Sequence, residues 1–80
     1  MDIRDTYGKV VFRKINNKIL DANGQWVYEI RGDRIFSSSG SWLYEIRMGN
    51  RIFDTGGKWL YEIRSNRIFD TSGKWLLTMA

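Results

Sequence analysis

Residues 59–75 read WLYEIRSNRIFDTSGKW, and this phrase recurs with few changes along the whole chain. Its copies are marked by tryptophans whose numbers differ by 16, 17 and 16, namely Trp26, Trp42, Trp59 and Trp75. Glycines at steps of 16, 16, 17 and 16 extend the count to a fifth copy, and they are Gly8, Gly24, Gly40, Gly57 and Gly73. A repeat this short and regular predicts an array of equivalent structural units.

Each copy is predicted to be a β-hairpin. Residues 59–64 alternate apolar with less apolar side chains, Ser65 and Asn66 interrupt, and residues 67–70 resume the alternation. This pattern is typical of two strands joined by a two-residue turn. The single spacing of 17 comes from one extra residue in the turn at residues 48–50. The chain has no proline, so no strand is barred from a hydrogen-bonded ladder.

The longer connections between hairpins follow a second pattern. Residues 70–74 and 54–58 both begin with Asp and contain Gly, whereas residues 37–40 read SSSG. An Asp side chain accepts hydrogen bonds from backbone two residues on, and Gly adopts the left-handed conformation that such loops need. We therefore expect these segments to be structured wide loops.

Alternation assigns the hairpin side chains to two faces. Trp59, Tyr61 and Ile63 share one face, which we predict to be the core. The opposite face carries Glu62 near the tight turn and Phe69 near the wide loop. The first full copy departs from this pattern, because residues 10–15 lack Trp and place Lys14 where other copies have Ile. Either Lys14 reaches water at the hairpin tip or the register shifts by one there.

The predicted fold is all-β, a single domain of residues 1–80 in which antiparallel hairpins surround one axis. We favour petals, as in a flower, a toroid or a small propeller, over an up-and-down β-barrel. A barrel would expose apolar rings on its outside at Phe36, Phe53 and Phe69. Residues 3–5 match the second strand of a hairpin and residues 75–80 match the first, so pairing of the termini is expected to close the ring. The same strands could instead pair between chains, which would give a strand-swapped homo-oligomer.

Composition narrows the class of protein. A chain of 80 residues buries only roughly 60% of its unfolded surface, and large aromatic side chains offset this limit. It has no Cys, so no disulfide framework forms. The charged start, with no long apolar run after it, predicts neither a signal peptide nor a membrane span, and favours the cytoplasm. The net charge of +4 permits an acidic partner without requiring one.

The phrases WLYEIRSNRIFDTSGKW and WVYEIRGDRIF resemble the hairpin repeats of bacterial small proteins called four-fold β-flower proteins. The resemblance covers nearly the whole chain. It implies a ring of hairpins, and the family's name implies four petals, which fits the four continuous hairpins better than a fifth that is split between the termini. It implies no catalytic activity and assigns no site residue.

Catalysis is not expected from this sequence. The chain has no His or Cys, and its repeated carboxylates Glu29, Glu45 and Glu62 occupy one position in successive copies. Near-identical copies do not provide the different roles that an active site needs. We instead expect each carboxylate to pair with an arginine diagonally across the hairpin, at Arg34, Arg51 and Arg67 respectively. We therefore predict no enzyme and no cofactor. We also predict no metal site, because each wide loop offers at most one carboxylate.

Two sets of side chains are candidates for binding. The first is an arginine collar near the tight turns, which could hold phosphate or nucleic acid and consists of Arg31, Arg34, Arg47, Arg51, Arg64 and Arg67. The simpler interpretation, which we favour, is that these arginines end each hairpin in water. The second is a set of matched aromatics that could line an axial pocket, Tyr28, Tyr44 and Tyr61, although a core role is commoner. The sequence favours a non-catalytic repeat scaffold acting as a binding or interaction module of unknown partner, a protein or a small ligand, with an anion or nucleic-acid binder as the alternative.

Overall fold

The computed structural model describes residues 1–79, and every regular element in them is a β-strand. In chain order the strands are β1 Asp2–Asp5, β2 Val10–Ile15, β3 Lys18–Asp21, β4 Trp26–Arg31, β5 Arg34–Ser37, β6 Trp42–Arg47, β7 Arg51–Asp54, β8 Trp59–Arg64, β9 Arg67–Asp70 and β10 Trp75–Met79. Within these residues, no helix is long and apolar enough to cross a membrane.

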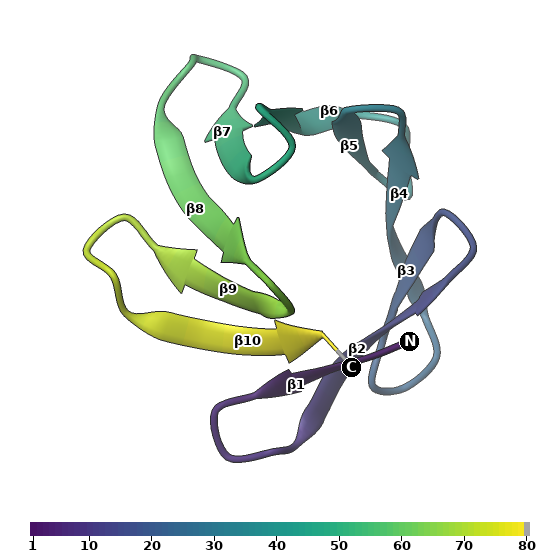
Figure 1. Cartoon of the computed structure of the whole chain (residues 1–80). Helices are drawn as coiled ribbons and strands as arrows, with labels where there is room; N and C mark the ends of the chain where they lie inside the picture. The colour runs from purple at the N-terminus through teal and green to yellow at the C-terminus, as the bar shows by residue number, and fades with distance from the viewer. Residues whose placement is uncertain (80) are drawn as a thin grey trace.

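The strands form one closed antiparallel ring around a central axis (Figure 1). Each strand pairs with its neighbours in sequence, and β1 pairs with both β2 and β10. The predicted all-β class, the hairpin repeats around one axis and the closure by terminal strands are therefore confirmed. The hairpins join edge to edge, as in the up-and-down barrel that we considered as the alternative. The ring is flat, with extents of 30 × 30 × 16 Å.

Residues 1–79 contain five equivalent hairpins, of which the one between β10 and β1 has its turn cut. In the continuous hairpins a turn carbonyl accepts a hydrogen bond from the next hairpin, for example Asn17 O from Ile30 N at 2.7 Å. The Met1 carbonyl accepts the equivalent bond from Lys14 N at 2.8 Å. The first residue thus occupies the place that a turn residue has in the other copies.

The wide loops are held as predicted by their first side chain. In the loop between β7 and β8, Asp54 Oδ1 accepts hydrogen bonds from the backbone N–H groups of Gly56 and Lys58, each at 2.9 Å. Gly57 in the same loop has a φ of 89°, in the left-handed region. In the loop between β5 and β6, which has no Asp, the Ser37 hydroxyl replaces the carboxylate and accepts a hydrogen bond from Ser41 N at 3.1 Å.

The tryptophans lie on the outer wall, so their predicted place in the core was wrong. Ile52 is opposite Tyr61 and Phe53 is opposite Trp59, which leaves Leu60 as an extra residue in a β-bulge. Because a bulge reverses the alternation beyond it, Trp59 shares the outer face with Phe53. Its indole Nε1 donates a hydrogen bond to the Tyr61 carbonyl at 2.8 Å. The same bulge recurs at the other wide loops.

The apolar rings on the outer wall are covered by arginine side chains. The Arg47 guanidinium lies 4.6 Å from the centre of the Phe53 ring, and equivalent stacks occur in the hairpins on either side. These phenylalanines are consequently only partly exposed. The long arginine stem and its charge together shield a ring that the barrel would otherwise present to water.

Lys14 keeps the register of the other copies. It is opposite Ile19, just as Ile30 is opposite Ile35 in the next hairpin. Its ammonium group reaches the tight turn and donates a hydrogen bond to the Asn16 carbonyl at 2.6 Å. Of the two alternatives left open by the sequence, the structure shows the lysine reaching the hairpin tip.

Candidate functional site

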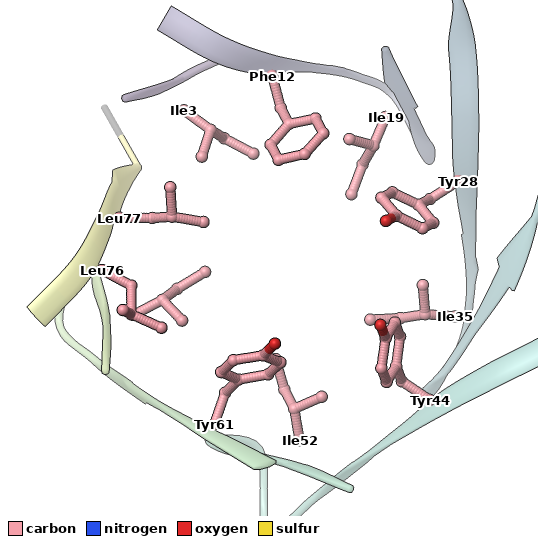
Figure 2. Close-up of a pocket in the computed structure, with 11 residues that line it drawn as sticks. Ile3, Phe12, Ile19, Tyr28, Ile35, Tyr44, Ile52, Tyr61, Leu76 and Leu77 are labelled. Carbon is pink, nitrogen blue, oxygen red and sulfur yellow. The ribbon is translucent and has the colours of Figure 1, made fainter. Parts of the chain in front are cut away.

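A cavity of about 300 Å³ occupies the centre of the ring (Figure 2). All of its lining side chains are apolar or phenolic, and they are Ile3, Phe12, Ile19, Tyr28, Ile35, Tyr44, Ile52, Tyr61, Ile68, Leu76 and Leu77. Figure 2 shows these side chains encircling an open centre. The three tyrosines named from the sequence as pocket candidates are all in this lining.

The lining follows from the pairing of strands across the wide loops. Two strands joined by a wide loop form one ribbon, so the ring has five ribbons in residues 1–79. Each ribbon contributes one aliphatic residue and one facing partner, for example Ile35 opposite Tyr44 and Ile52 opposite Tyr61. The remaining pairs are Ile3 with Phe12, Ile19 with Tyr28, and Ile68 with Leu77. The sequence analysis named only the tyrosines as pocket candidates, although the recurrence of Ile at one position in each copy was a usable signal for the aliphatic half of the lining.

The centre stays open because the ring is wide. A barrel of eight strands is about wide enough for side chains to fill its interior, and this ring has ten strands within residues 1–79. Few side chains are buried as a result: among the described residues only Ile3 and Ile52 are buried, with exposed fractions of 6% and 8%. The aromatic residues that would fill a narrower ring instead form the wall of a cavity.

The polar groups of the cavity lie on one side of it. Hydroxyls come from three successive ribbons at Tyr28, Tyr44 and Tyr61, while the equivalent positions in the other two ribbons hold Phe12 and Leu77. Those two ribbons are neighbours through the pairing of β1 with β10. The cavity therefore has a hydroxyl-bearing side and a wholly apolar side.

The tyrosine hydroxyls are available to a ligand. None of them hydrogen-bonds to another group within residues 1–79. In the same residues, every polar side-chain atom that is buried has a hydrogen-bond partner, so these unpartnered hydroxyls are not buried and face open space. Burial raises the pKa of the Tyr44 phenol, and the neighbouring phenols of Tyr28 and Tyr61 raise it further. Tyr44 is thus a protonated hydrogen-bond donor at neutral pH.

Three of the collar arginines form ion pairs that the sequence analysis did not predict. Arg31 contacts Glu29 at 3.3 Å and Arg64 contacts Glu62 at 2.9 Å, and Arg47 with Glu45 makes the third pair at 3.6 Å. The predicted diagonal partners of these carboxylates were wrong. Residues two apart on one strand share its outer face, and here that neighbour is closer than the diagonal one.

The other three collar arginines stack on tryptophan. The Arg34 guanidinium lies 4.6 Å from the Trp42 ring centre, and Arg67 lies 4.5 Å from Trp75, with Arg51 on Trp59 as the third case. Within residues 1–79 no carboxylate is within 4.0 Å of these guanidinium groups. The collar is therefore packed on the outer wall. Sequence reasoning missed these stacks because they depend on the bulge that turns Trp outward.

Comparisons with known proteins add no function: no family model, curated protein or solved structure matches this chain. The resemblance to four-fold β-flower proteins stays a prediction, and the ring of residues 1–79 has five hairpins where that name implies four. Within the same residues no three acidic side chains gather closely enough to hold a metal ion.

Proposed function

We propose that this protein is a non-catalytic binding module that holds a small molecule in the centre of its ring. The observation that carries this proposal is the cavity of about 300 Å³, whose apolar wall presents three tyrosine hydroxyls on one side. Small-molecule sites are typically concave and mostly apolar, with a few polar groups that orient the ligand, and they begin at about this volume.

The scaffold supports a preformed site. The lining side chains project from strands that are hydrogen-bonded on both sides around the whole ring. No strand edge is left unpaired in residues 1–79, so hydrogen bonds hold the wall together around its whole circumference. A ligand would therefore bind without the cost of ordering a loop.

The chemistry of the wall favours binding over catalysis. The cavity lining includes no carboxylate and no lysine among the described residues, so the phenols are its only ionisable groups. A general base works best when its pKa is close to the working pH. The raised pKa of Tyr44 moves that phenol away from such a role.

The proposal is tested by filling the cavity. We expect native mass spectrometry to find a retained compound, or an NMR titration with naphthalene to shift the methyl signals of Ile52, which also lines the cavity. Ile35→Phe places a ring in the cavity and should abolish binding, whereas Ile15→Phe makes the same change at a site that is 55% exposed and should not. Binding that survives Ile35→Phe, or no bound compound by either method, would contradict the proposal.

A second candidate, an anion or nucleic-acid binder, is favoured by one observation. Arg34, Arg51 and Arg67 have no ion-paired carboxylate within residues 1–79, so their guanidinium groups have unused donors. Retention on immobilised heparin should then fall steeply with salt and be lost when all three are changed to Gln. The matched control changes the ion-paired arginines instead, at residues 31, 47 and 64. Absence of retention at low salt would eliminate this candidate.

A further inference from the structure

The five equivalent ribbons make unequal contributions to the cavity. Across the sequence repeat, one lining position is Phe12 in the first ribbon, Tyr in the next three, and Leu77 in the last. This unequal placement puts all hydroxyls on one side of an otherwise apolar wall. A ligand that matches the wall would have one polar edge and one apolar edge.

The volume sets the size of that ligand. An apolar cavity of about 150 Å³ in a protein core accommodates benzene. The cavity here is about 300 Å³, which is twice as large. A molecule with two fused aromatic rings is therefore the appropriate size, and the lining supplies four aromatic side chains for it to pack against.

The charge of the wall sets the charge of the ligand. Every arginine of the collar packs against a ring on the outer wall, and none lines the cavity. A ligand with a net charge would lose its hydration in the cavity without gaining an opposite charge. Burial raises the pKa of Tyr44, so this phenol remains an uncharged hydrogen-bond donor at neutral pH.

We infer that the cavity selects an uncharged, two-ring aromatic molecule that carries a hydrogen-bond acceptor on one edge, directed at Tyr28, Tyr44 and Tyr61. This inference rests on the proposed small-molecule site and adds the class of its ligand. The apolar edge of the ligand lies toward Phe12 and Leu77.

The test compares three probes of similar shape by NMR titration of the protein at neutral pH. Quinoline has an acceptor nitrogen in the ring, naphthalene has none, and 2-naphthoate carries a negative charge. One net hydrogen bond changes affinity by about two- to twelve-fold, so we expect quinoline to bind tighter than naphthalene by about that factor. We expect 2-naphthoate to bind more weakly than either.

Removal of the hydroxyls supplies the matched variants. Changing Tyr28, Tyr44 and Tyr61 together to Phe keeps the rings and should equalise the affinities for quinoline and naphthalene. Tyr7→Phe removes a hydroxyl at a loop site that is 95% exposed and should leave the preference intact. The three single variants and the wild-type comparison carry the test if the triple variant does not fold.

The outcomes separate this inference from the proposed site. Equal binding of quinoline and naphthalene to the wild type, or a preference that persists in the triple variant, overturns the inference and leaves the cavity as a binding site. Tightest binding by 2-naphthoate overturns it as well. If neither uncharged probe shifts the Ile52 methyl signals, the inference is overturned. The proposed site is then judged by whether Ile35→Phe abolishes binding of a compound retained from the host.

Discussion

Substitution of Gly57 by Ala should destabilise the barrel through backbone strain alone. Gly57 has a φ of 89°, and a Cβ placed there would meet no atom within 4 Å. An L-residue in a left-handed conformation costs about 1–2 kcal/mol. In a domain of this size each kcal/mol lowers the melting temperature by about 4–8 °C, so we expect a decrease of about 4–16 °C. Urea unfolding should show a lower midpoint with an unchanged slope.

The neighbouring Gly56 is the matched control for this prediction. Its φ is not in the positive range, and an added Cβ would stand 3.4 Å from Asp54 Oδ1, an ordinary contact. Gly56→Ala should therefore leave the free energy of unfolding unchanged or raise it slightly, because Ala restricts the unfolded chain. Equal losses in the two variants, or no loss at Gly57, would refute the account of the wide loop.

Three further perturbations have definite expected results. Because the pKa of Tyr44 is raised, the folded state holds the phenolic proton more tightly than the unfolded chain does. The contribution of this phenol to stability is complete below the usual pKa of 10.0 and is lost as pH rises through the folded pKa. Tyr44→Phe should therefore make the loss of stability at alkaline pH shallower in urea titrations. Arg51→Gln should lower the free energy of unfolding by about 0.5–1 kcal/mol, and a double-mutant cycle with Trp59→Leu should show coupling of that size; no coupling would contradict the stack. Hydrogen bonds, first that from the Ser72 hydroxyl, lower the pKa of Asp70, so its contribution is present above 3.8 and is lost as pH falls through the folded pKa; an Asp70→Asn variant with an unchanged acid limb would contradict this.

The hairpins and the closure of the ring could be predicted because they depend on spacing. Residues 3–5 repeat residues 68–70, and that match alone indicates which strand the N-terminus replaces. The structure pairs Arg4 with Thr78 accordingly. The place of Lys14 also followed from the repeat, since it takes the position of Ile30 without any change of register.

The faces of the strands could be predicted only as far as the bulge. Counting in twos from the tight turn correctly places Tyr61 and Ile68 inside, and fails at Trp59, because Leu60 is an extra residue with no partner of its own. A bulge depends on how two strands pair and has no signature in the residues of one strand, so an alternating pattern does not reveal it. The error hid the tryptophan stacks.

The tyrosine half of the cavity could be predicted, but its open centre could not. Matched positions indicate that Tyr28, Tyr44 and Tyr61 share one environment, whether it is a filled core or a pocket wall. The difference depends on the number of strands and on their tilt, which together set the width of a barrel. A ring of four hairpins would bring these side chains closer together than the five observed in residues 1–79.

Closure of the ring within one chain is most directly tested by NMR on the purified protein. We expect nuclear Overhauser effects between backbone protons of Arg4 and Thr78, which are paired residues of β1 and β10, in a uniformly labelled monomer. In an equal mixture of labelled and unlabelled chains, an isotope-filtered spectrum that records only contacts between chains should lack these signals. Their appearance in the filtered spectrum, or their absence from the labelled monomer, would contradict a ring sealed by its own terminal strands.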